Sequence, residues 1–424
     1  MEKTYQMEGY TLHVIPTQKF KTTTVSLRLQ SALTKEFTTI RTLLTFVIGA
    51  ATRKLPSTKL LATHLDDNYG ASLSVHISSK GQSQIMNVFS TFVNENYLPQ
   101  KESLFEKQIE LIHDLFFDPY LVHHAFDEKI VNQKKKELKE RLKASQDDKF
   151  SYSLDKLFEY MGQDQSLGIS STGYEAEIDA ITPRALYQYF IKCIETDEKH
   201  FYIVGDVDEN MIQILKEKLQ FPKQDHHYIS SYQFKTKKDE VLEVIEKQDV
   251  TQSKLNMGYQ IDCDFISEDH YAMTVLNALF GGFSQSRLFQ VVREKNSLCY
   301  YVSSSYDAFN GIMVVNAGIN AQDYTKTKAL IQEQLTDIQN GHIEDNEIHI
   351  AKIMLQNALR KTNDEASSMI VLSYNRDMTQ KKETNEEYIQ KLLNVTKEDL
   401  IRVSQKVKLD TIFFLTGKDF NENN

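Results

Sequence analysis

The sequence repeats one pattern at about half its own length. Ile181–Leu186 reads as a helix start and is followed by an apolar strand pattern at Phe201–Asp206. Near the C-terminus, Val395–Leu400 and Ile412–Gly417 follow in the same order. The threonine in each helix start is a good N-cap, because its hydroxyl can accept from an unpaired N–H of the first turn. The two threonines lie 214 positions apart and the glycines that end the strands 212 apart, in a chain of 424 residues. A single repeat at that distance predicts two similar lobes rather than a solenoid.

Strand and helix patterns are mixed in both halves of the chain, which predicts an α+β protein. Residues 1–221 form the predicted N-terminal lobe and residues 239–424 the C-terminal lobe. The polar stretch at 222–238 is the predicted linker between them. Long charged helices are expected near Asp127–Met161 and Glu344–Tyr374.

Charge and cysteine content exclude several classes of function. The formal net charge of -10 disfavours nucleic-acid binding, which depends on clustered Lys and Arg. Cys193, Cys263 and Cys299 are far apart and indicate neither a disulfide framework nor a thiolate metal site. No apolar run approaches membrane-spanning length, and the first residues lack a signal-peptide pattern. We therefore expect a cytoplasmic protein without a membrane span.

Several motifs resemble those of the pitrilysin/insulinase-type zinc peptidases. Gly281–Phe289 followed by Val292–Tyr300 resembles the glycine pair, Ser-Arg-Leu-Phe helix start and Arg-Glu-Lys string of that family's second lobe. Phe201–Asp208 resembles the strand that closes its first lobe, and Leu65–Gly70 its Leu-Glu-x-x-Gly-Gly turn. The resemblance runs in order over nearly the whole chain. It implies two similar lobes, each a mostly antiparallel sheet packed against helices.

Active members of that family carry His-x-x-Glu-His on a helix, where two histidines at i and i+4 bind zinc and the glutamate activates a water molecule. The matching positions here are Thr42, Thr45 and Phe46; a register shifted by one gives Leu43, Phe46 and Val47. A further zinc-binding glutamate is replaced by Arg141, beside Glu140. Neither register supplies a ligand, and an arginine repels a cation. The resemblance thus implies no metal, no cofactor and a chain that is not itself a peptidase.

Three other histidine groups are candidates for a relocated metal site. His123 and His124 lie close in sequence to Asp127 and Glu128, but a solvated loop before a helix is the better interpretation. His226-His227 in the linker shows no ligand spacing. A third group combines His342 and His349 with Glu347, without helical zinc spacing.

Arg293 and Tyr300 match second-lobe residues that help active relatives bind substrate and polarise its carbonyl. The resemblance implies that they face a peptide or a partner; the alternative is a purely structural role. Ser72–Ser79 is the candidate sheet edge that could accept an extended peptide as an added strand.

The expected partner is a zinc-bearing homologous chain in a heterodimer, or a second copy in a homodimer, with a peptide as possible ligand. We expect an accessory subunit or scaffold. An active metallopeptidase with a relocated or shared site is the alternative. Within the family, the resemblance extends to zinc-less bacterial proteins that are linked to modification of elongation factor P.

Overall fold

The computed structural model describes residues 2–98, 102–223, 234–236, 238–381 and 383–420. Most of the predicted linker at 222–238, including His226 and His227, lies outside the described residues. The chain divides into two compact units of interleaved segments. Unit 1 comprises Met1–Lys143, Ser170–Ile229 and Thr362–Asn375; unit 2 comprises Ala144–Ile169, Ser230–Lys361 and Arg376–Asn424.

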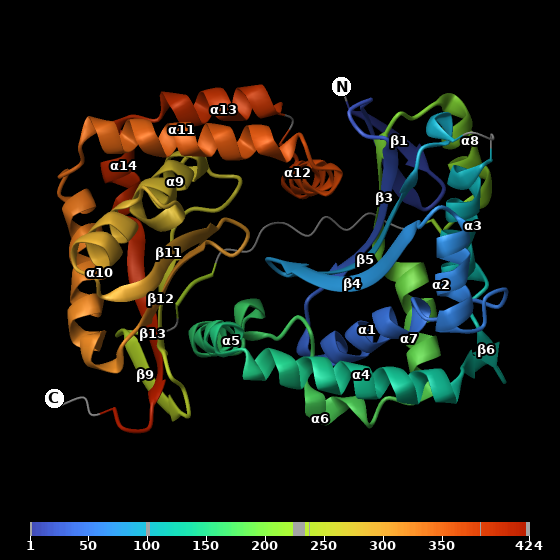
Figure 1. Cartoon of the computed structure of the whole chain (residues 1–424), viewed down its shortest axis with the longest axis horizontal. Coiled ribbons are helices and arrows are strands. Elements are labelled where there is room, and N and C mark those ends of the chain that lie inside the picture. The colour runs from blue at the N-terminus through green and yellow to red at the C-terminus, as the bar shows by residue number, and fades with distance from the viewer. Residues whose placement is uncertain (1, 99–101, 224–233, 237, 382, 421–424) are drawn as a thin grey trace. The chain divides into compact units, whose positions relative to one another are not determined.

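The sheet of unit 1 has the strand order β1-β2-β8-β3-β5-β4 (Figure 1). Its strands are β1 (Lys3–Met7), β2 (Tyr10–Pro16), β3 (Thr22–Ala32), β4 (Ser72–Lys80), β5 (Ser83–Val93) and β8 (Glu198–Gly205). The β2–β8 pair is parallel and the other pairs are antiparallel. In the described part of the chain, β4 has a strand neighbour on one side only, so the predicted edge strand is confirmed.

The sheet of unit 2 has the order β11-β12-β10-β13-β9 and repeats this topology. Its strands are β9 (Leu242–Gln248), β10 (Ser253–Ile261), β11 (Cys299–Asp307), β12 (Ile312–Ile319) and β13 (Val407–Gly417). Only the β9–β13 pair is parallel among the paired strands of this sheet, as β2–β8 is in unit 1. The two strands of the sequence repeat, β8 and β13, thus occupy equivalent places. The predicted α+β fold with mostly antiparallel sheets is confirmed.

Helices cover both sheets. Those of the first half are α1 (Lys35–Ile48), α2 (Thr58–Asp67), α3 (Leu104–Phe117), α4 (Glu128–Asp147), α5 (Lys149–Gly162), α6 (Glu175–Ile178), α7 (Pro183–Thr196) and α8 (Glu209–Lys218). Those of the second half are α9 (His270–Asn277), α10 (Tyr324–Gln339), α11 (Asp345–Thr362), α12 (Ala366–Thr379), α13 (Asn385–Asn394) and α14 (Lys397–Ser404). Two π-helical segments, Ala278–Gly282 and Leu288–Lys295, lie between α9 and β11. No helix among the described residues is both long and apolar enough to cross a membrane.

Each of the two long predicted helices is in fact two helices. The first breaks between α4 and α5, where the Asp148 carboxylate accepts a hydrogen bond from the Phe150 N–H and caps a new helix. The second breaks between α11 and α12. Shortly before each break the chain passes to the other unit: Ala144–Ile169, which contains α5, belongs to unit 2, and Thr362–Asn375 belongs to unit 1.

The segment that contains α5 completes the core of unit 2. Leu157 and Met161 on this helix pack with Val314 and Phe413, and all four side chains are buried. Gly258 on β10 leaves room for this contact, because a Cβ there would lie 2.7 Å from the Met161 sulfur. The unit 2 sheet therefore buries apolar side chains on both faces, because alternate residues of β12 and β13 belong to two different clusters, one of which includes α5.

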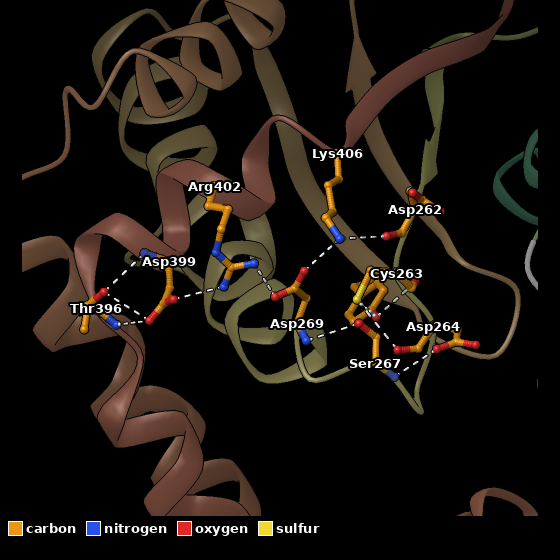
Figure 2. Close-up of polar contacts among 10 residues, drawn as sticks. Asp262, Cys263, Asp264, Ser267, Asp269, Thr396, Asp399, Arg402 and Lys406 are labelled. Atoms are coloured by element: carbon orange, nitrogen blue, oxygen red, sulfur yellow. Dashed lines mark hydrogen bonds and ion pairs between the residues drawn. The ribbon is translucent and has the colours of Figure 1, made fainter.

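The helix starts of the sequence repeat are capped as predicted. The Thr182 hydroxyl accepts from the Ala185 N–H, and Thr396 forms a capping box with Asp399. Figure 2 shows how the second copy is tied to the loop before α9, where Asp269 contacts both Arg402 and Lys406. Burial alone would raise the pKa of Asp269, but these two cations hold the pKa below its usual value.

Candidate functional site

The residues of α1 that the family resemblance matches to the zinc motif lie on two different faces of this helix. Leu43 and Val47 are buried in the apolar core of unit 1, so they cannot face a site. Thr42 and Phe46 point to the side on which helix α4 passes, and the Arg141 guanidinium lies 5.7 Å from the centre of the Phe46 ring. The structure therefore brings together a phenyl ring and a guanidinium at two of the positions that the family resemblance assigns to zinc ligands.

The side chains at these positions do not fit a zinc ion. The Thr42 hydroxyl donates to the Thr38 carbonyl at 2.9 Å, and the Thr45 hydroxyl donates to the Thr42 carbonyl at 2.8 Å. Both hydroxyls are thus engaged by their own helix, as is common for threonine in helices. A phenyl ring offers no lone pair, and a guanidinium repels a cation. No zinc chemistry can be derived from this donor set.

The segment before α6 covers this part of α1. The Ser171 carbonyl accepts a 2.6 Å hydrogen bond from Gln84 and lies 3.5 Å from the Thr42 hydroxyl. Gly173 has φ of +87°, and a Cβ there would lie 2.6 Å from the Cα of Thr39. A glycine is required at this close crossing of segment and helix.

A buried ion pair holds α1 in its place in unit 1. Arg41 is fully buried and donates to Asp197 at 2.6 Å and to the Leu29 carbonyl at 2.7 Å. The pair raises the pKa of Arg41 against the opposing effect of burial. Lys199 on β8 is also buried and donates to the Asp197 carbonyl. Helix α1 is therefore held by polar contacts of Arg41 to β3 and to Asp197, the residue that precedes β8.

Lys199 gives a testable pH dependence. Burial lowers its pKa to about 8. Because the folded pKa lies below that of a free lysine, the ammonium form costs stability below pH 8, and the cost fades as pH rises towards 10.4. Relative to a Lys199→Met variant, we expect the wild-type protein to gain about 3 kcal/mol between pH 7.5 and 10.4. Urea unfolding of both proteins across this range measures the difference; a constant difference would contradict the prediction.

The face of the unit 1 sheet opposite its apolar core carries polar side chains. In the strand register, His200, Arg28, Asn87 and His76 lie in one row across β8, β3, β5 and β4. We call these four residues the polar row. Arg28 is 8% exposed and lies over the rings of Tyr202 and Tyr374, at 5.4 and 4.3 Å. Partial burial and the charges of Arg28 and Arg141 lower the pKa of His76.

A chain of polar contacts continues this face on β2 and β8. His13 Nε2 and His200 Nδ1 lie 3.2 Å apart, and both rings stack with Tyr202. The carboxylate of Glu2 lies 3.5 Å from His13, and that of Glu198 lies 3.1 Å from His200. No motif in the sequence indicates this histidine pair; the parallel pairing of β2 with β8 is the signal that could have found it.

In unit 2, the family-like motif Gly281–Phe289 has a clear structural role. Arg287 forms a two-pronged ion pair with Glu347 at 2.6 Å and also donates to the His342 carbonyl. This anchors α11 to the helix that follows the glycine pair. Gly281 passes so close to β11 that a Cβ would lie 2.7 Å from the Ser304 nitrogen. The motif therefore positions β11, which carries Tyr300.

Tyr300 and Arg293 lie near the edge of the unit 2 sheet. Tyr300 is 81% exposed on β11, the edge strand. Arg293 lies 4.5 Å from the Phe289 ring and 3.8 Å from Glu294. Burial raises the pKa of Cys299 to about 11, while the charge of Arg293 opposes this shift, which places Arg293 near the start of the same strand. No hydrogen bond joins Arg293 to Tyr300 among the described residues.

The other histidine groups have structural positions. His123 and His124 are the two turn residues of the β6–β7 hairpin (Leu121–Val122 and Ala125–Phe126), both with positive φ. Asp127 caps α4 by accepting from the Ile130 N–H. Glu347 is engaged by Arg287, and His342 contacts Asp337. In the part of the chain that the structure describes, neither group brings three ligand atoms together for a metal.

The fold and this substituted site can be compared with known proteins. Residues 180–355 match the family model described as Peptidase M16 inactive domain. Over 97% of its length the chain is 34% identical to "Probable inactive metalloprotease YmfF" of Bacillus subtilis strain 168, and the match covers 96% of that protein.

Two solved structures have the same fold. A conserved protein from Enterococcus faecalis V583 superposes with a TM-score of 0.91 at 30% identity, over 99% of this chain and 100% of that chain. A protease from Helicobacter pylori superposes with a TM-score of 0.81 at 16% identity, over 98% and 99% of the two chains.

The fold is that of a two-lobed metallopeptidase. The chain belongs to the peptidase M16 family, and it is a homologue that lacks the residues of the zinc site. The predicted pitrilysin/insulinase-type resemblance is confirmed. The prediction that the chain is not itself a peptidase agrees with the descriptions of the matching family model and the Bacillus relative.

Proposed function

We propose that this chain is a non-catalytic accessory subunit or scaffold that binds an extended peptide for a zinc-bearing homologue in the cytoplasm. The proposal rests on one observation: the residues at the expected zinc positions are replaced, whereas the second-lobe residues expected to face a peptide are kept. The zinc positions hold Thr42, Thr45, Phe46 and Arg141, whereas the second-lobe residues Arg293 and Tyr300 are still present and partly or largely exposed.

The edge strand β4 supports the peptide-binding part of the proposal. Every second residue of an edge strand directs its backbone N–H and C=O away from the sheet, where another strand can pair with them. Leu73, Val75 and Ile77 are half-buried on the core side, and alternate residues are polar. An added strand with the same alternation would extend both faces.

Tyr300 supports the part of the proposal in which unit 2 contacts a peptide or a partner chain. A tyrosine that is 81% exposed leaves most of a large aromatic ring in water. Aromatic residues of this kind are enriched among the residues that dominate binding energy at interfaces. Arg293, with a half-exposed guanidinium beside Phe289, adds a charged donor near the same strand.

The first experiment is a tagged pull-down from the native cell, with mass measurement of the intact complex. Recovery of one homologous chain that carries His-x-x-Glu-His per copy of this chain would support the heterodimer. Recovery of the chain alone or as a homodimer would overturn the heterodimer. Zinc-dependent cleavage by the pure chain, stopped by a chelator, would overturn the non-catalytic role in favour of a relocated site.

Arg293→Ala combined with Tyr300→Ala is expected to weaken substrate or partner binding at least tenfold, because two exposed anchors are lost. The matched control is Tyr97→Ala, which removes another exposed tyrosine, 49% exposed, from unit 1. Binding is measured with the recovered complex, and the melting temperature checks folding. If the double variant folds and binds like the wild-type protein, the two residues have only a structural role.

A further inference from the structure

The histidine pair of unit 1 has the geometry of two ligands to one metal ion. His13 Nε2 and His200 Nδ1 lie 3.2 Å apart, and His13 is 1% exposed. Two imidazole nitrogens that bind one zinc ion at tetrahedral angles, each about 2.05 Å from the metal, lie about 3.3 Å apart. The same separation suits one hydrogen bond between the rings. The groups around the pair therefore decide between a metal ion and a shared proton.

The outer nitrogen of each ring faces a carboxylate. His13 Nδ1 lies 3.5 Å from Glu2, and His200 Nε2 lies 3.1 Å from Glu198. Histidines that bind a metal through one nitrogen usually donate the N–H of the other nitrogen to such a partner, which fixes the tautomer of the ring. When both outer nitrogens carry the proton, the two inner nitrogens present bare lone pairs to each other. A cation between them turns this repulsion into attraction.

Helix α12 brings a third ligand to the pair. One ligand atom from each of His13, His200 and Asp377 lies within 4.8 Å of the other two. Asp377 follows Ser373 by one helical turn, and the Ser373 hydroxyl donates to the Glu2 carboxylate beside His13. Positions i and i+4 share a helix face, so Asp377 lies on the side of α12 that meets this contact. The boundary between the two units crosses α12 without interrupting the helix.

The charges of the neighbouring groups favour a divalent cation. Glu2, Glu198 and Asp377 bring three carboxylates to the pair. Arg28 brings one guanidinium from β3, where it lies opposite His200 in the strand register. Among these groups, two neutral imidazoles leave two negative charges uncompensated, one added proton leaves one, and a divalent ion leaves none. Charges withdrawn from water need such compensation.

We propose that His13, His200 and Asp377 bind a divalent transition-metal ion, for which zinc fits the ligand set best. The site lies on the face of the unit 1 sheet opposite the apolar core, whereas the substituted positions of α1 lie on the core side. The ion joins β2, β8 and α12, so it fixes the returning segment that completes unit 1. The burial of His13 suits a structural ion, because catalytic zinc needs an accessible coordination position.

The test is a zinc titration of the full-length protein after a chelator has removed its metal. Isothermal titration calorimetry with zinc chloride should give one ion per chain and a dissociation constant on the order of 1 µM. Magnesium chloride should not compete, because magnesium prefers oxygen ligands. Zinc should also raise the melting temperature and slow hydrogen exchange in α12. The absence of saturable zinc binding would overturn the site and leave a shared proton as the account of the histidine pair.

Four variants locate the ion. Asp377→Asn and His200→Gln should each weaken zinc binding roughly 100-fold or more, since loss of even an outer-shell partner costs about 10- to 100-fold. Glu198→Gln, which changes such a partner, should weaken it about tenfold. The matched control is His342→Gln, which removes a histidine whose side chain is 72% exposed and should leave the affinity unchanged. Melting temperatures without zinc check folding, and the two ligand variants lie on different elements, so that one remains as the test if the other unfolds.

The remaining outcomes are equally distinct. Zinc binding that survives both Asp377→Asn and His200→Gln would overturn this location, as would an equal loss of binding in His342→Gln. Zinc-dependent peptide cleavage that requires His200 would overturn the structural role of the ion. The site does not depend on the proposed accessory function, which is judged separately by the pull-down.

Discussion

Replacing Arg41 by methionine is expected to destabilise unit 1 by about 3 to 5 kcal/mol, because the buried Asp197 carboxylate then loses its partner. Both side chains are almost completely inaccessible to water, at 0% and 4% exposure. The Leu29 carbonyl also loses a 2.7 Å hydrogen bond. Urea unfolding monitored by circular dichroism measures the change, and hydrogen exchange of strands β3 and β8 assigns it to unit 1.

The controls distinguish an unpaired charge from a lost contact. Arg41→Met together with Asp197→Leu removes both charges and should recover most of the stability, since replacing a buried pair by apolar residues is often neutral or stabilising. Lys139→Met breaks an exposed pair with Asp179 and should change stability by less than about 1 kcal/mol. A loss below 1 kcal/mol for Arg41→Met would show that the Asp197 site can be hydrated.

The elements of the fold that depend on local sequence were predictable. The strands β8 and β13 and the caps Thr182 and Thr396 were all found from the repeat, because capping and apolar runs are short-range signals. The edge position of β4 came from the family resemblance. Each long charged stretch has the pattern of one helix, since the turn after α4 contains no glycine or proline. Only the Asp148 cap marks that break.

The exchange of segments between the units could not be predicted from pattern. Nothing local distinguishes the apolar side of α5 from that of a helix that stays in its own unit. Its placement depends on a close fit, such as the contact of Met161 with Gly258. The same limit applies to the site: Phe46 and Arg141 are distant in sequence, and only the passage of α4 over α1 brings them together.

The polar row illustrates a further limit. Arg28 stands in a strand whose neighbours alternate towards the core, so its inward or outward direction is predictable from the period of two. That no ion pair of Arg28 is found in the part of the chain that the structure describes could not be predicted, because ion pairing depends on which strands lie beside β3. The register that aligns Arg28 with Asn87 and His76 is set by the β4–β5 hairpin and by the pairing of β5 with β3.

Restoring four side chains is expected to convert the substituted site into a zinc site. The variant carries Thr42→His, Thr45→Glu, Phe46→His and Arg141→Glu. Positions 42 and 46 share one face of α1, and the Phe46–Arg141 contact shows that residue 141 reaches this face. Two histidines and a glutamate are the three protein ligands of many catalytic zinc sites. We expect one additional zinc per chain, with a dissociation constant on the order of 1 µM, equivalent to about -8 kcal/mol.

We expect weaker zinc binding than at structural zinc sites, because Ser171 lies against residue 42 and must move to admit a histidine. Metal analysis after dialysis and calorimetric titration measure the gain. The triple variant that keeps Arg141 should bind about 100-fold more weakly, since a guanidinium then faces the ion. Leu43→His with Val47→His has the same spacing but places both rings in the core, so it should unfold unit 1 and bind none. If the folded quadruple variant binds no additional zinc, the segment at 170–173 closes the site, and loss of metal binding at these positions involved backbone packing as well as the four side chains.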